Sequence, residues 1–234
     1  MKRNLFFIPG VTAVLLFLTF NPSNAWFDET HLAIAKVAGY FKWFNAPGPD
    51  MIREKIGDRE GHNHFVNNPR GTLVTPEMVS GQVAKYNKID NHGHLYGAII
   101  ASIRDYIKKA KTGKYAEYHL AFCSHYAGDL SQPFHNIEYN KFNRENHMNV
   151  DGIINDEVLG NQDKIKIYPI TIDSEEAIIR EVARIANLSL ALGYKLEDEK
   201  RLLSKEEAYQ QISHSASLFK AILGYVETVA KQDK

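Results

Sequence analysis

The chain has 234 residues, with 28 basic and 28 acidic side chains and one cysteine, Cys123. This balanced charge argues against a protein that is held tightly on nucleic acid or on an anionic membrane by overall attraction. A single cysteine excludes an intramolecular disulfide, and we interpret Cys123 as a packing residue of a helix.

The first 25 residues have the pattern of a secretory signal peptide. A basic start precedes a mostly apolar run over residues 5–20, and small residues follow as far as Ala25. Pro9 and Gly10 interrupt the run, so its unbroken part is short for a membrane span of about 20 residues. We predict cleavage after Ala25, a secreted or periplasmic protein, and no transmembrane segment after processing. The mature chain would start at Trp26 and lose two basic residues (28 − 2 = 26), which gives a formal charge of −2.

The remaining 209 residues (234 − 25) predict one all-α domain without repeats or linkers. Apolar residues at helical spacing, N-cap residues and glycine- or proline-containing stops define its elements. The predicted helices cover residues 29–44, 75–86, 97–111, 115–130, 143–159, 174–192 and 204–231. Thr75, Ser174 and Ser204 are the predicted N-caps. Residues 57–75 are predicted to form a long loop, and residues 164–172 a short extended segment.

The segment from His125 to Asp151 contains five side chains that bind zinc well. His125 with Asp129, and His147 with Asp151, are four residues apart and therefore lie on one face of a helix. His135 follows a proline that would end the first of these helices. One such pair is explained by a surface contact that stabilises a helix slightly, but two pairs with His135 favour a metal site. Imidazole and carboxylate together suit zinc or a similar first-row ion.

Cleavage after residue 25 would supply a further chelating group. The free α-amino group and the carbonyl oxygen of Trp26 can form a five-membered ring around a metal ion. His31, in the first turn of the first predicted helix, can then close that site.

These residues resemble the zinc-dependent phospholipase C and P1/S1 nuclease superfamily. Its members begin at a mature Trp that binds zinc through its amino and carbonyl groups, and they contain a His-x3-Asp-x5-His segment followed by a His-x3-Glu or His-x3-Asp pair. The resemblance extends from residue 26 to about residue 160 and implies a single multi-helix, all-α domain with a metal cluster between helices. It implies these metal ligands: Trp26, His31, Asp50, His64, His125, Asp129, His135, His147 and Asp151.

Two of these ligands have competitors nearby. Asp58 competes with Asp50, and His62 competes with His64. The Pro-Asp and His-Phe contexts and the spacing of 14 residues match the phospholipase branch, which favours Asp50 and His64. The alternative interpretation of Asp50 is an ordinary N-cap of a helix that begins at Met51, and the residue could serve in both roles. The remaining histidines are interpreted as packing or surface residues: His92, His94, His119 and His214.

The resemblance implies three zinc ions. The first would be held by Asp50, His64, His125 and Asp129, the second by Asp129, Trp26 and His31, and the third by His135, His147 and Asp151. Three aspartates leave such a cluster positively charged, which suits a phosphodiester in its more negative transition state. Paired metals activate water, so no Ser or Cys nucleophile is needed, and Asp50 is the candidate catalytic base.

The substrate class stays open between two branches. The final His-x3-Asp pair and the Trp-x4-His start resemble the nucleases, whereas the short chain and the Pro-Asp…His-Phe segment resemble bacterial phospholipases. Met51 replaces the aromatic residue of phosphatidylcholine-preferring members. We favour a bacterial-type phospholipase C that acts as a monomer on phospholipid. The alternatives are a single-strand nuclease or 3′-nucleotidase of the S1/P1 type, which would form no stable nucleic-acid complex, and a secreted zinc-binding helical protein without turnover.

Overall fold

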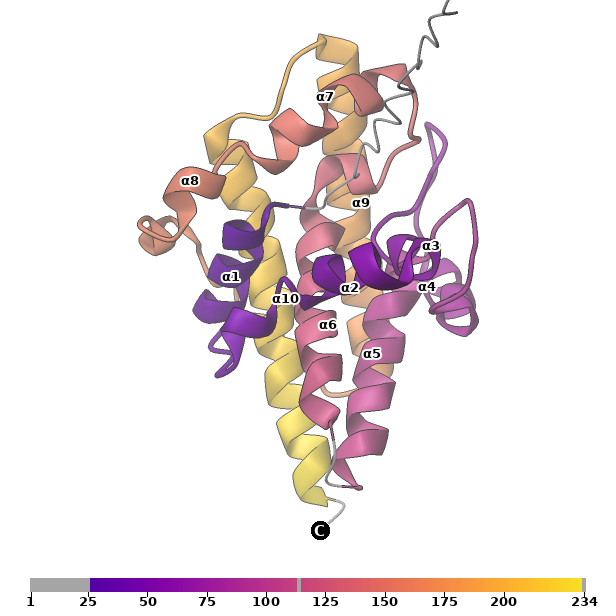
Figure 1. The fold of residues 1–234 in the computed structure, drawn as a ribbon, viewed down its shortest axis with the longest axis vertical. Coiled ribbons are helices and arrows are strands. Elements are labelled where there is room, and N and C mark those ends of the chain that lie inside the picture. Colours follow the sequence, from indigo (N-terminus) through magenta and orange to yellow (C-terminus); the bar gives the residue numbers. More distant parts are fainter. Residues whose placement is uncertain (1–25, 113–114, 233–234) are drawn as a thin grey trace, which may run out of the picture.

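The computed structural model describes residues 26–112 and 115–232, which fold into α-helices joined by turns and loops (Figure 1). The predicted signal peptide lies outside the described residues. Within these ranges no β-strand occurs, although one isolated antiparallel bridge joins Val66 and Gly93. The α-helices are α1 (Asp28–Val37), α2 (Gly48–Ile56), α3 (Asp58–Gly61), α4 (Pro76–Gln82), α5 (Leu95–Ala110), α6 (Ala116–Ser131), α7 (Lys141–Asp151), α8 (Asn155–Val158), α9 (Glu175–Glu199) and α10 (Lys205–Gln232). The all-α fold class is therefore confirmed. None of the helices in the described ranges has the length and apolarity needed to cross a bilayer.

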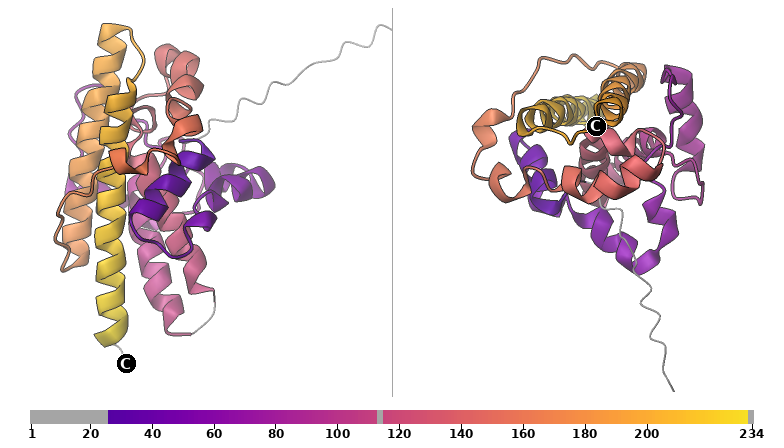
Figure 2. Two further views of the ribbon diagram at one scale, coloured as in Figure 1. Left: turned by 90° about the vertical axis from the view of Figure 1, so that its left-hand side faces the viewer. Right: turned by 90° about the horizontal axis from the view of Figure 1, so that it is seen from above.

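Helix α6 lies at the centre of the single domain. It packs along α5 and α10 and also contacts α1, α2 and α9. Helices α9 and α10 lie on one side of α6, and α2 and α3 lie on the other (Figure 2). Two buried serines join these layers: Ser189 Oγ of α9 donates to Leu130 O (2.8 Å), and Ser215 Oγ of α10 donates to Ala127 O (2.6 Å). Both carbonyl groups lie in the last turns of α6, so α9 and α10 hold that end of the helix in place.

The predicted N-caps are confirmed. Thr75 Oγ1 accepts from Met78 N (3.4 Å), and Ser174 Oγ accepts from Ala177 N (3.2 Å). Ser204 Oγ accepts from the N–H of the third residue of α10 at 3.2 Å. Each hydroxyl satisfies one of the donors that a helix start leaves without an intrahelical partner.

Three predicted helices are wrong in their extent, and the loop predicted over residues 57–75 contains the short helix α3. The helix predicted over residues 174–192 continues to Glu199. The helix predicted over residues 29–44 ends at Val37, because Gly39 adopts φ +87° and turns the chain away from the helix axis. The helix predicted over residues 143–159 is divided into α7, which ends at Asp151, and α8, which begins at Asn155.

The segment predicted to be extended, residues 164–172, belongs to no strand of the described structure. Its backbone instead pairs with α10: Lys166 N donates to Ser213 Oγ (2.9 Å) and Tyr168 N donates to Ser217 Oγ (2.8 Å). Alternate residues face the helix because successive side chains of an extended chain point to opposite sides. Ile165 is buried, whereas Ile167 is 37% exposed, so the contact with α10 explains the alternation of Ile with polar residues only in part.

Candidate metal centre

The structure brings the eight predicted His and Asp ligands together at one end of α6. They form three groups in which the ligand atoms all lie within 4.8 Å of one another. The groups are His31 with His125 and Asp129, Asp50 with His64 and His125, and His135 with His147 and Asp151. The i,i+4 pairs on α6 and α7 supply two members to the first and the third group. The other ligands are His31 on α1, Asp50 on α2, His64 after α3, and His135 on the short helix η3 (Pro133–His135).

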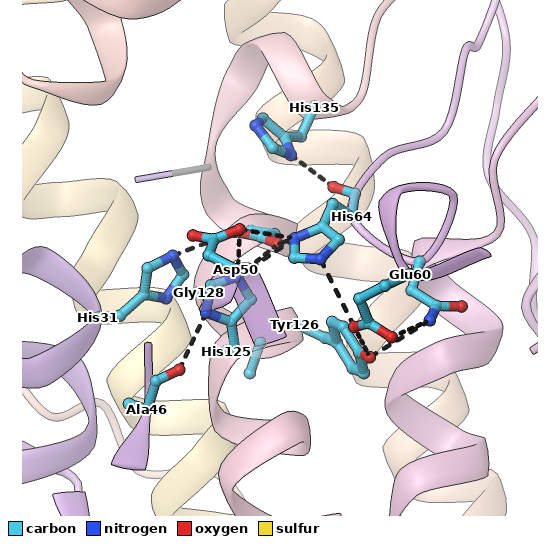
Figure 3. A network of polar contacts seen from close by, with 12 residues as sticks. His31, Ala46, Asp50, Glu60, His64, His125, Tyr126, Gly128 and His135 are labelled. Atoms are coloured by element: carbon cyan, nitrogen blue, oxygen red, sulfur yellow. Dashed lines mark hydrogen bonds and ion pairs between the residues drawn. The ribbon is translucent and has the colours of Figure 1, made fainter. Parts of the chain in front are cut away.

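Asp129 lies between two sets of imidazoles. Figure 3 shows His31, His64 and His125, which converge on this site. Asp129 Oδ1 is 3.3 Å from His31 Nε2. Its Oδ2 is 3.0 Å from His64 Nδ1 and 3.5 Å from His125 Nε2. Because its two oxygens face different histidines, this fully buried carboxylate has the geometry of a ligand that bridges two ions.

Asp50 is the third residue of α2, so the prediction that it is an N-cap is wrong; the helix starts earlier, at Gly48. Its Oδ1 is 3.7 Å from His64 Nδ1 and 3.6 Å from His125 Nε2. The side chain is 17% exposed, whereas those of His64 and His125 are at most 1% exposed. Asp50 is therefore the carboxylate of this group that water can reach.

The third group is built around the turn that follows α6. His147 Nε2 is 3.0 Å from His135 Nε2 and 3.4 Å from Asp151 Oδ2. The Gln132 amide ties these residues together: its Nε2 donates to Asp151, and its Oε1 accepts from the backbone N–H groups of Phe134 and His135. This arrangement fixes η3 relative to the end of α7.

Trp26 is completely buried. The next residue, Phe27, donates its N–H to Asp151 O at 3.4 Å, and its ring lies against Gly152, where an added Cβ would be 2.8 Å from Phe27 Cε2. The start of the described chain is thus packed on the end of α7. The ligand role of the Trp26 α-amino group stays a prediction, because that group exists only after cleavage.

The histidines are oriented by oxygen atoms behind them. His125 Nδ1 is 3.0 Å from Ala46 O, and His147 Nδ1 is 2.6 Å from Asn143 Oδ1. His135 Nδ1 contacts the carbonyl oxygen of His64. In each case the other ring nitrogen, Nε2, faces the ligand group. Histidines that bind metals are held in this way, with one nitrogen on an acceptor and the other on the ion.

The pKa values reflect crowding of charges in a buried site. Burial favours the neutral form of His64, but contacts with Asp129 and Glu60 outweigh it and raise its pKa to about 10. Burial and the neighbouring His31 lower the pKa of His125 to about 4. Burial also opposes the charge of Asp129, yet attraction to the surrounding histidines holds the pKa of its carboxyl well below the ordinary value. The buried carboxylates thus favour a positive charge within this group, and a metal ion would supply one.

A further observation indicates that these ligand groups suit a bound metal ion. Asp129 Oδ1, Asp151 Oδ2 and Asp50 Oδ1 are all buried and accept no hydrogen bond from any described residue. Burial also raises the pKa of Asp151 well above its ordinary value, although the Gln132 amide opposes the shift. Buried carboxylate oxygens normally have a hydrogen-bond donor or a cation as partner. Divalent ions among these oxygens and the imidazole nitrogens would meet that requirement.

A cavity of about 220 Å³ adjoins two of the ligand groups. It is lined by His64, Phe65, Asn67, Phe134, His135, Tyr139 and His147. A small molecule that entered it would therefore meet His64 from the second group and both histidines of the third.

The other histidines take part in none of the three groups found among the described residues. His94 Nε2 is 2.8 Å from Asn63 Oδ1, and His119 Nδ1 is 3.8 Å from Asp105. Two residues that contact the ligands were missed in the sequence: Glu60, beside His64, and Asn143, beside His147. Both precede their histidine by four residues, the same spacing that singled out the His-Asp pairs, so the signal was present.

Gly128 lets α1 approach α6 closely enough for His31 to reach Asp129. A Cβ at residue 128 would lie 2.6 Å from His31 Nδ1 and 2.7 Å from its Cε1. We expect Gly128→Ala to displace His31 and to reduce the zinc content of the purified protein by about one ion, as measured by elemental analysis. Gly224→Ala in α10, where no atom lies within 4 Å of the added Cβ, is the matched control and should keep all its zinc. Full metal content in Gly128→Ala would mean that His31 is not a ligand.

Comparison of the chain with protein-family models, with curated proteins and with solved structures gives no match. The description of the site therefore rests on its own geometry. The chain forms an all-helical domain in which three buried groups of His and Asp side chains are consistent with a metal site.

Proposed function

We propose that the protein is a zinc-dependent hydrolase that cleaves phosphodiester bonds. The observation that supports this most directly is the convergence of eight His and Asp side chains beside a cavity, with one carboxylate placed between two imidazole sets. Zinc ions held together in such a site lower the pKa of bound water and stabilise the attacking and leaving oxygens of a phosphoryl transfer.

The residues of the chain have separate tasks in this proposal. Asp129 is the shared ligand, because its two oxygens face different histidines. His135, His147 and Asp151 form the separate third ligand group beside the cavity. Asp50 accepts the proton of the attacking water, because it is the solvent-accessible carboxylate beside His64 and His125.

The preferred substrate in this proposal is a phospholipid. Phe41, Phe44 and Met51 are 84%, 59% and 62% exposed, and all three lie in the segment that leads to and includes the start of α2, next to Asp50. Met51 follows Asp50 directly, and exposed apolar residues in the segment that carries a site residue suit contact with the surface of a lipid aggregate. The formal charge of −2 after cleavage provides no general attraction for nucleic acid.

The test is a parallel hydrolysis assay on protein that starts at Trp26 and has been loaded with zinc. Phosphatidylcholine vesicles, single-stranded RNA and a 3′-nucleotide are compared, each with and without a chelator. We expect chelator-sensitive release of a phosphorylated head group from the vesicles. Chelator-sensitive cleavage of RNA, or loss of the 3′-phosphate, would replace the phospholipase with a nuclease. No turnover of any substrate by fully zinc-loaded protein would leave a zinc-binding protein without catalysis.

Asp50→Asn separates catalysis from metal binding. We expect turnover to fall by about 10²–10⁴-fold, the usual contribution of a general base, while most of the zinc is retained by the other ligands. Zinc content and turnover are measured on the same preparation. Undiminished turnover would remove Asp50 from the mechanism, and loss of most of the zinc would make it chiefly a ligand.

A further inference from the structure

Glu60 is a buried carboxylate beside the ligand groups that the ligand set does not include. It is 1% exposed and lies on α3, four residues before His64. Its Oε1 is 3.6 Å from His64 Nε2, the ring nitrogen opposite the one that faces Asp129 and Asp50. Figure 3 shows Glu60 on the side of the His64 ring away from His31 and Asp50.

Glu60 is held in position by two further donors. Tyr126 Oη donates to Oε1 at 2.5 Å, and Asn63 Nδ2 donates to Oε2 at 3.1 Å. Asn63 is itself fixed, because its Oδ1 accepts from Asn87 N (3.1 Å) and lies 2.8 Å from His94 Nε2. Each oxygen of Glu60 therefore accepts a hydrogen bond, and the His64 ring lies beside Oε1.

The partner of His64 differs in kind from those of the other oriented histidines. His125, His135 and His147 place their rear nitrogen on a neutral oxygen, from two backbone carbonyls and one amide. Within the described part of the chain, His64 is the oriented histidine of the site that has a carboxylate behind it. A carboxylate partner fixes the tautomer of a ligand imidazole and increases its basicity more than a neutral partner does.

We propose that Glu60 is a positioning residue for His64: it accepts the Nε2–H and so presents Nδ1 to the ion that His64 shares with Asp50, His125 and Asp129. The two atoms are 3.6 Å apart, slightly beyond hydrogen-bond distance, and His64 Nε2 is buried without a hydrogen-bond partner among the described residues. The proposal rests on the proposed zinc centre. Its consequence is that this ion is held more tightly than it would be with a neutral residue at position 60.

The test uses Glu60→Gln, which keeps the size of the side chain and an oxygen for Tyr126 but removes the charge. Zinc is withdrawn from wild-type and variant protein by competition with a chromophoric chelator. We expect one of the bound ions to lose about 10–100-fold in affinity while the others are unchanged. The ¹⁵N resonances of zinc-loaded protein should show Nε2 of His64 protonated in both forms, with the signal of a strong hydrogen bond only in the wild type.

A second variant and its control replace a tyrosine. Tyr126→Phe removes a donor to Glu60. The control, Tyr40→Phe, removes a buried hydroxyl that donates to the carbonyl and carboxylate oxygens of Glu117, away from the ligands. We expect Tyr126→Phe to weaken the same ion as Glu60→Gln, by a smaller factor, and Tyr40→Phe to weaken none. Because Tyr126→Phe leaves Glu60 in place, it also serves if Glu60→Gln fails to fold.

The possible failures are distinct. Wild-type protein that binds no zinc would overturn the metal centre and this assignment together. Wild-type protein that binds zinc, with unchanged affinities and an unchanged His64 resonance in Glu60→Gln, would overturn the role of Glu60 alone. Equal weakening of all ions, or a similar effect of Tyr40→Phe, would show that Glu60 only stabilises the fold.

Discussion

Removal of zinc is expected to lower the melting temperature strongly. A site whose ion is present at about 1,000 times its dissociation constant adds about 4 kcal/mol to the free energy of unfolding, and each kcal/mol corresponds to about 2–4 °C in a domain of this size. We therefore expect a loss of roughly 8–16 °C for each site emptied by a chelator. The physical reason is that the ligand groups are buried and include carboxylate oxygens without hydrogen-bond partners among the described residues.

The measurement is a thermal melt followed by circular dichroism before and after chelation. Zinc added back should restore the original melting temperature, and Mg²⁺ should not, because Mg²⁺ binds through oxygen ligands and water whereas these groups are rich in imidazole. An unchanged melting temperature in protein shown to have lost its metal would mean that the clusters are stable hydrogen-bonded networks in their own right.

Asp129→Asn is expected to have the largest effect of any single ligand replacement. The variant loses the negative charge that faces His31 on one side and His64 with His125 on the other. We expect the zinc content to fall from three ions to about one, the ion held by the third group, and turnover to fall below detection. Elemental analysis and the hydrolysis assay measure the two effects.

Asp151→Asn is the comparison for that variant, because Asp151 belongs only to the group with His135 and His147. It should reduce the zinc content by about one ion. If Asp129→Asn and Asp151→Asn lost the same amount of zinc, Asp129 would be a ligand to a single ion rather than a bridge.

The sequence predicted best what depends on local geometry. The pairs His125 with Asp129 and His147 with Asp151 share a helical face because residues four apart always do. The N-caps were predictable for a similar reason, since a serine or threonine before acidic residues satisfies a helix start by itself. Helix ends were less predictable, because the apolar spacing continues past Val37, where Gly39 adopts a positive φ and the helix ends.

The assembly of the site could not be derived from local patterns. His31 and Asp129 are almost a hundred residues apart in the chain, and only the packing of α1 on α6 across Gly128 brings them to 3.3 Å. The carbonyl oxygen of Ala46 that orients His125 has no sequence signal, because every residue has a carbonyl group. His31 was predicted to be a ligand because of the resemblance to a family, and the structure places its ring beside Asp129.

The serine contacts from α9 and α10 to α6 have a consequence for the order of events during synthesis. The last ligand, Asp151, leaves the ribosome well before Ser189 and Ser215, which bind the carbonyl groups of Leu130 and Ala127. Until α9 and α10 are present, the end of α6 that bears Asp129 lacks its support. We therefore expect the complete ligand array to form only after α9 and α10 have been made, so that a metal ion would bind late in the maturation of the chain.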